Sequence, residues 1–162
     1  MVDEKTMQPQ GSGETNTGEV IIQKIYVKDL SFEAPNAPKV FGMEWKPSID
    51  VHFQSEATPL GADQQEVVLS VTVTVSFEEM TVYLVEVQQA GIFVLTKVGE
   101  KMLDRVLATV CPNIIFPFVR ETISYTVIRG GFPQLLLSPV NFGHLYAQET
   151  QRKGQEQSGE EN

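Results

Sequence analysis

The chain has 162 residues, a formal net charge of −9 and a single cysteine. This length suits one domain, and 21 acidic against 12 basic side chains, without a cluster of Lys or Arg, argue against nucleic acid as a partner. A lone thiol excludes an intrachain disulfide and fits a reducing compartment.

Both ends of the chain are polar. Residues 1–19 hold almost no bulky apolar side chain, and residues 148–162 hold no Leu, Ile, Val or aromatic residue. Such segments bury too little surface to offset the entropy of ordering. We therefore expect disordered tails at 1–19 and 148–162 around one folded domain at 20–147. The first tail is too polar for a signal peptide, and no window offers the ~18 consecutive apolar residues of a membrane span, so we predict a cytoplasmic protein without membrane insertion.

The first half of the domain predicts two strands joined by a long loop. Val20–Phe32 is rich in β-branched and aromatic residues, although its middle alternates imperfectly. Pro35 and Pro38 then rule out a continuing helix or interior strand. Ser48–Gln54 alternates apolar and polar residues, the period of a half-buried strand, and ends before a turn-rich stretch at 56–63.

Two further strands follow at once. Glu66–Phe77 alternates throughout, and Thr81–Gln89 alternates after the short gap at Glu78-Glu79-Met80, which predicts a hairpin. The short gaps exclude helical crossovers between most strands. The four strands therefore predict an antiparallel sheet.

The remainder reads as helix. Lys97–Val110 carries an apolar stripe at spacings of three and four, which Pro112 interrupts, and Ile114–Arg129 carries a second stripe that Gly130-Gly131 can cap. A short helix follows from Phe142 to about Gln148, after a capping asparagine. Strands followed by helices indicate an α+β protein, with a four-stranded sheet packed on one side by helices.

The predicted loops hold more apolar surface than one layer of helices can cover. They contain Phe41, Trp45, Phe132 and the run Leu135–Leu137. Either protomers associate or a groove stays open for apolar ligands, and both can hold at once.

Residues for catalysis are sparse. His52 and His144 lack the spacing of a metal site, and Gly99-Glu100-Lys101 lacks the upstream glycine of a phosphate-binding loop. Cys111 reads as a small buried hydrophobe, the alternative being a nucleophile assisted by His144. We predict no catalytic residue, no metal and no cofactor.

Several strings along the chain carry a resemblance. They are IYVKDLSFEAPNAPKVF at 25–41 followed by Trp45-Lys46-Pro47, EVQQAGIF at 86–93, CPNIIFP at 111–117, GFPQL at 131–135 and PVNF at 139–142. In this order they resemble the SecB family of bacterial export chaperones, over about residues 23–146. The resemblance implies a homotetramer, a dimer of dimers with sheets outward and helices at the centre. It also implies an ATP-independent holder of unfolded precursor proteins that delivers them to the SecA translocation ATPase.

The resemblance also implies residue roles. The SecA-binding positions of the family fall on Asp29, Glu33, Leu84 and Glu86. Our candidates for the client-binding groove are Phe41, Trp45, Phe116, Phe132 and Leu135, each with a plain core role as the alternative. Val85 and Val87 resemble positions near the oligomer interface, with ordinary sheet packing as the alternative.

Two other functions remain open. One is a specialised SecB-like chaperone for a single client, such as the antitoxin of a stress-response pair, although the four retained SecA-binding positions favour export. The other is an enzyme that uses Cys111.

Overall fold

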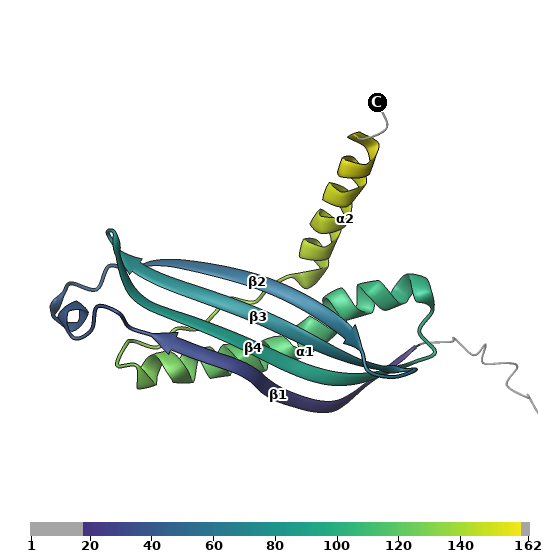
Figure 1. The fold of residues 1–162 in the computed structure, drawn as a ribbon, viewed down its shortest axis with the longest axis horizontal. Coiled ribbons are helices and arrows are strands. Elements are labelled where there is room, and N and C mark those ends of the chain that lie inside the picture. Colours follow the sequence, from purple (N-terminus) through teal and green to yellow (C-terminus); the bar gives the residue numbers. More distant parts are fainter. Residues whose placement is uncertain (1–17, 160–162) are drawn as a thin grey trace, which may run out of the picture.

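The computed structural model describes residues 18–159 and has an α+β architecture (Figure 1). Its elements, in chain order, are β1 (Glu19–Glu33), a 3-10 helix η1 (Lys39–Gly42), β2 (Ser48–Pro59), β3 (Gln64–Phe77), β4 (Met80–Thr96), α1 (Glu100–Arg129) and α2 (Phe142–Gly159). All four predicted strands are confirmed. β2 and β4 extend further than predicted, β2 into the turn-rich stretch and β4 through Thr96.

The sheet has the order β1-β4-β3-β2, and every neighbouring pair is antiparallel. The predicted hairpin joins β3 to β4, where Phe77 pairs with Met80 across two turn residues. Glu78, the first of these, has a φ of 55°, the positive value that tight hairpin turns require. The loop after β1 crosses to the far edge of the sheet, because β1 and β2 form its two edges.

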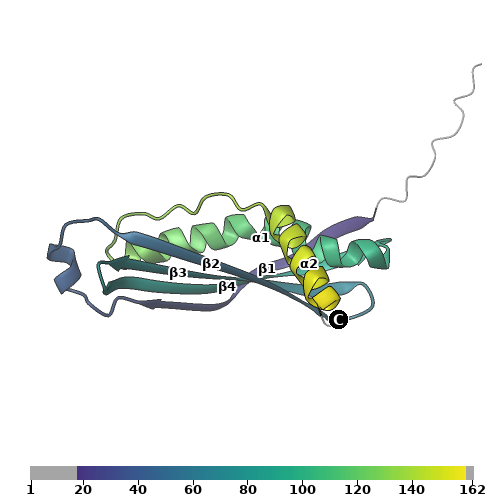
Figure 2. The same ribbon diagram turned by 90° about the horizontal axis from the view of Figure 1, so that it is seen from above.

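The core lies between α1 and one face of the sheet, which we call the inner face (Figure 2). Along β3 every second residue from Val67 to Val75 is at most 1% exposed. From α1, side chains spaced four apart meet them, among them Ile115, Val119 and Ile123, all without exposed area. The opposite face, which we call the outer face, is covered by no helix of the described residues.

Two β-bulges explain the imperfect alternation of β1. Its register against β4 shifts between Ile22 and Lys24 and again between Val27 and Asp29, so Gln23 and Lys28 are extra residues. Paired residues of neighbouring strands share a face. The residues that pair with the inner-face side of β4 are Val20, Ile22, Ile25, Val27, Leu30 and Phe32. With two bulges, spacings of two and three keep this entire apolar series on the inner face.

The prediction of two helices separated by Pro112 is wrong, because α1 runs unbroken over 30 residues with Pro112 and Pro117 inside it. A proline removes one helical hydrogen bond, from the carbonyl four residues earlier. Here those carbonyls belong to Ala108 and Asn113, and neither residue is buried, so water can donate instead. Continuous packing of α1 on the inner face outweighs the two lost bonds.

The C-terminal segment also differs from prediction. The disorder expected for 148–162 is wrong for 148–159, since α2 continues to Gly159. The Asn141 side chain caps this helix, accepting a hydrogen bond from the His144 N–H at 3.0 Å. The helix packs on α1 rather than on the sheet, and its far end projects away from the body (Figure 1). Most of the tail predicted at 1–19 lies outside the described residues.

Candidate functional site

Five aromatic rings from five parts of the chain meet at one end of the inner face. This aromatic cluster consists of Phe32 of β1, Phe41 of η1, Trp45 of the following loop, Tyr83 of β4 and Phe132 after α1. Phe132 is the shared member, with ring centroids 4.8 Å from Tyr83 and 5.1 Å from Phe41. Such tilted pairs stabilise beyond their buried area.

The end of α1 places Phe132 in the cluster. Gly130 caps the helix as predicted, with its N–H bonded to the Thr126 carbonyl at 2.9 Å, and the Phe132 N–H reaches the Val127 carbonyl at 3.2 Å. A Cβ at Gly130 would lie 2.3 Å from the Phe32 ring. Gly130 and Gly131 therefore turn the chain, and their lack of a side chain lets the rings of Phe32 and Phe41 come close to the backbone.

The cluster has a buried base and an open rim. Tyr83 and Phe132 are 1% and 6% exposed, whereas Phe41 and Trp45 are 51% and 44% exposed. The loop that carries the rim is tied to the start of β4, because the Asn36 side chain donates to the Thr81 carbonyl at 2.8 Å. The rim thus offers two large aromatic surfaces to solvent on a fixed backbone.

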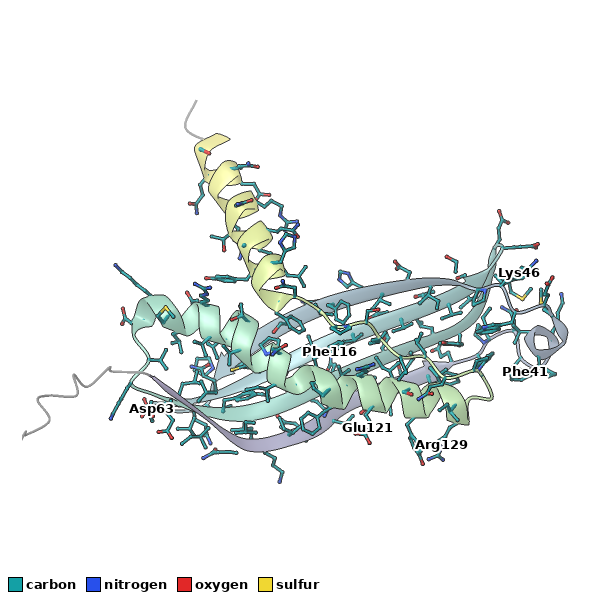
Figure 3. The ribbon with its side chains drawn as sticks, turned by 180° about the vertical axis from the view of Figure 1, so that it is seen from behind. Phe41, Lys46, Asp63, Phe116, Glu121 and Arg129 are labelled. Carbon is teal, nitrogen blue, oxygen red and sulfur yellow. The ribbon has the colours of Figure 1, made fainter. Side chains whose placement is uncertain are left out.

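The other two predicted groove residues lie apart from the rim. Phe116 is 7% exposed and packs between Phe53 of β2 and Phe142 of α2, with ring centroids 6.2 and 6.1 Å away. Figure 3 shows Phe41 and Phe116 at separate places along the molecule. Leu135 is half-buried against the core. Phe116 therefore has a core role in this chain, and its role toward clients stays a prediction.

On the outer face, the strand register brings the four predicted SecA-binding residues together. Glu33 pairs with Leu84, and Ser31, between Asp29 and Glu33 on β1, pairs with Glu86. Asp29, Glu33 and Glu86 are exposed, and Leu84 is partly exposed between them. Residues from two neighbouring strands thus form one continuous surface.

Asp50 of β2 belongs to the same surface, although sequence reasoning did not include it. It pairs with Thr74, which pairs with Leu84, so Asp50 and Glu33 lie in one row across the sheet. The alternation in Ser48–Gln54 already placed Asp50 on the polar side, but only the strand order joins it to Glu33. We call Asp29, Glu33, Asp50 and Glu86 the acidic patch.

No cation neutralises the acidic patch from within the described chain. Across residues 18–159 the ion pairs are Lys28–Glu66 and Lys46–Glu44, and neither includes a member of the patch. Four unpaired carboxylates on a flat face attract a basic partner and speed its approach.

Val85 and Val87, which we predicted to lie near the oligomer interface, are 0% and 1% exposed on the inner face, within the core of their own chain. Sheet packing therefore accounts for their side chains, and a place near a subunit interface stays a prediction. Apolar surface is instead exposed on α1, at Val110 (41%), Phe118 (42%) and Tyr125 (61%), together with Ile128 (49%). These four side chains lie on one side of the helix, and we call them the α1 stripe.

α1 carries more apolar side chains than its packing on the sheet covers. Its length and composition alone match a membrane span, and 33% of its most apolar 18-residue stretch is buried. Ile22, Val27 and Leu30 of the edge strand β1 add inner-face apolar surface that is 44–47% exposed. This surface and the α1 stripe together leave seven large apolar side chains uncovered in the described chain.

Two pockets flank α1, where the segment after Phe132 runs back along the helix. The first, about 580 Å³, is lined by Thr109, Val110, Asn113, Ile114 and residues 139–143. The second, about 540 Å³, is lined by Phe116, Pro117, Arg120, Glu121, Ser124, Tyr125, Ile128, Gln134, Leu136 and Pro139. Both include members of the α1 stripe, so the stripe borders the two pockets.

Cys111 has no exposed area and faces the core. Burial raises the pKa of its thiol to about 12, which leaves almost no thiolate at neutral pH. We therefore expect iodoacetamide at pH 8 to modify the folded protein far more slowly than the protein in urea, as measured by intact mass. Fast modification of the folded protein would instead support a nucleophilic role.

No group of three or more His, Cys, Asp or Glu residues in the described part of the chain could hold a metal ion.

The chain is similar to known proteins over most of its length. A family model described as preprotein translocase subunit SecB matches residues 13–153. A protein-export protein SecB of Nitrosococcus oceani is 48% identical over 155 residues, which cover 94% of each chain. A protein of the same name from Halorhodospira halophila is 51% identical over 134 residues, covering 83% of this chain and 78% of the relative.

One solved structure supports the fold. It is a SecB-like chaperone of Mycobacterium tuberculosis in complex with a ChAD peptide from the HigA1 antitoxin, with a TM-score of 0.62 and 18% identity. The match covers 75% of this chain and 90% of that one. At this identity the likeness concerns the fold alone.

Proposed function

This chain belongs to the SecB family of protein-export chaperones, and we propose that it holds unfolded precursor proteins without nucleotide and passes them to the SecA motor. The aromatic rim would contact the precursor, and the acidic patch would contact SecA. The two surfaces lie on opposite faces of the same sheet, which is the observation that carries the proposal. A client and the motor can then be bound at the same time.

The aromatic rim suits an unfolded chain. A general holder needs apolar contact without a strict shape requirement, and exposed aromatic rings supply large contact areas with few rotatable bonds. Phe41 and Trp45 present such rings above the buried Phe132, with centroids 5.1 and 6.2 Å from it. We assign client contact to these two side chains, with Phe132 as their support and Leu135 beside it.

The acidic patch suits a basic segment of SecA. Its four carboxylates are exposed, and Leu84 offers an apolar contact between Glu33 and Glu86. Charge gives such a contact its specificity and rate, and the apolar residue adds affinity. The assignment of Asp29, Glu33, Leu84 and Glu86 therefore stands as our proposal, with Asp50 added.

We further propose a homotetramer in the cytoplasm. The α1 stripe and the exposed inner-face residues of β1 form a large apolar surface, which self-association would cover. Facing α1 helices would leave the outer faces, and with them the acidic patches, turned to solvent. In this arrangement the α1 stripe and β1 form the contact, and Val85 and Val87 lie in the core between the sheet and α1.

The single-client alternative is less well supported. The antitoxin peptide belongs to a structure only 18% identical to this chain, whereas relatives at 48% and 51% identity are protein-export proteins. The retained acidic positions also favour a motor partner. The SecB family is not a family of enzymes, and the buried thiol of Cys111 gives no support to a catalytic role.

The proposal is tested by mixing the purified protein with a slowly folding precursor and with SecA, in the absence of ATP. Mass measurement by light scattering should show a tetramer alone, a tetramer with precursor, and a complex of all three. The double variant Phe41→Ala/Trp45→Ala should raise the Kd for the precursor about tenfold. Truncating an aromatic side chain that anchors a partner costs over about 1 kcal/mol of binding free energy. The variant should keep tetramer mass and SecA binding. A monomer that ignores the denatured precursor would refute the proposal.

A further inference from the structure

The second bulge of β1 decides which residues reach the acidic patch. Before the bulge Val27 pairs with Gln89, and after it Asp29 pairs with Gln88. If Lys28 occupied a regular strand position instead of a bulge, strict alternation would turn Asp29 and Glu33 to the inner face and Phe32 to the outer face. The bulge therefore determines the face on which these side chains lie. It puts the carboxylates of Asp29 and Glu33 on the outer face and the Phe32 ring on the inner face.

The bulged residue is tied to a strand that is not its neighbour. The Lys28 ammonium donates to Glu66 Oε1 at 2.8 Å, and the Tyr26 hydroxyl donates to Glu66 Oε2. Glu66 is on β3, so these bonds pass over β4, a span of ~9–10 Å between backbones. Ala90, the β4 residue paired with Tyr26, is small and has no exposed area, which fits side chains crossing above it.

The bridge is partly shielded from water. The Glu66 side chain is 14% exposed and that of Lys28 45% exposed. Hydrogen bonds from Lys28 and then from Tyr26 lower the pKa of Glu66, and the bond to Glu66 raises the pKa of Tyr26 to about 12. The first bulge is held in a similar way, because the Gln64 side chain donates to the Gln23 side chain at 2.5 Å. Each bulged residue thus has a partner on β3.

We propose that Lys28 and Glu66 are positioning residues for the SecA-binding face. Their bridge holds the bulge that turns Asp29 and Glu33 outward beside Glu86. The inference rests on the proposed contact between the acidic patch and SecA. On charge alone, a cation beside the acidic patch would weaken the binding of a basic partner. Through the bridge, Lys28 instead strengthens that binding.

The test is a pair of charge-conserving double variants on the outer face, measured by calorimetry with SecA. Lys28→Met/Glu66→Gln removes the bridge and should raise the Kd ~tenfold. Lys24→Met/Glu56→Gln makes the same chemical change at two outer-face residues that no hydrogen bond joins, and should leave the Kd unchanged. Lys28→Arg, which keeps the bridge, should retain the affinity of the parent chain.

The single variant Lys28→Met separates position from charge. Loss of a cation alone would tighten binding of a basic partner, whereas loss of the bulge geometry weakens it. Amide chemical shifts at Asp29 and Ser31 should move in this variant. Tighter binding, or an unchanged Kd in Lys28→Met/Glu66→Gln, would overturn the inference and leave the proposed function standing. A parent chain that does not bind SecA would overturn both.

Discussion

Glu86→Lys should weaken SecA binding by about 10- to 100-fold while leaving precursor holding intact. Glu86 is exposed at the centre of the acidic patch, next to Ser31 and Thr72 on the flanking strands. A lysine there places like charges against a basic segment, and a 10- to 100-fold loss corresponds to about 1.4–2.7 kcal/mol. Calorimetry with SecA measures the affinity, and protection of a refolding precursor from aggregation measures holding.

The matched control is Glu56→Lys, an identical change of charge on β2. Glu56 is exposed and faces the same side, since it pairs with Val68, but it lies toward the other end of the sheet. Its affinity for SecA should fall much less than that of Glu86→Lys. Equal losses in the two variants would show that net charge, rather than the acidic patch, governs motor binding.

Phe132→Ala should lower the free energy of unfolding by about 3–5 kcal/mol, the usual cost of truncating a buried phenylalanine. Four other rings contact Phe132 from three strands or loops, so its loss leaves a cavity under the whole cluster. Urea denaturation at fixed protein concentration, followed by circular dichroism, gives the change. Precursor holding should fall with it, because Phe41 and Trp45 lose their support.

Leu136→Ala is the control for this prediction. It lies four residues further along the same segment and is 56% exposed, so its truncation should cost about 1 kcal/mol or less. A similar urea midpoint for both variants would mean that the aromatic cluster does not stabilise the domain.

Strands with simple alternation could be predicted closely from the sequence. The β3 pattern holds because a central strand covered by α1 must keep one apolar face. The alternation of β1 could not be resolved, since a bulge depends on partners such as Glu66, which lies 38 residues away from Lys28. The acidic patch was predicted only in part for a similar reason: Asp50 joins it through the strand order.

The helical region was predicted less well. Pro112 was read as a helix end on local grounds, and tertiary packing of Cys111 and Ile115 on the sheet overrides that preference. The absence of apolar residues after Gln148 excluded a core but not a helix. Gln, Glu, Lys and Arg are strong helix formers, and the anchored first turn at Phe142 provides the start that an isolated helix lacks.

The position of Cys111 has a practical consequence for spectroscopy. A chain whose native sulfhydryl is inaccessible can accept an introduced cysteine at a chosen surface site without background from its own. One such substitution in the outer half of α2, for example Gln155→Cys, would carry a single dye or spin label on the projecting helix. Distances between labels in an assembled particle would then report directly how the subunits are arranged.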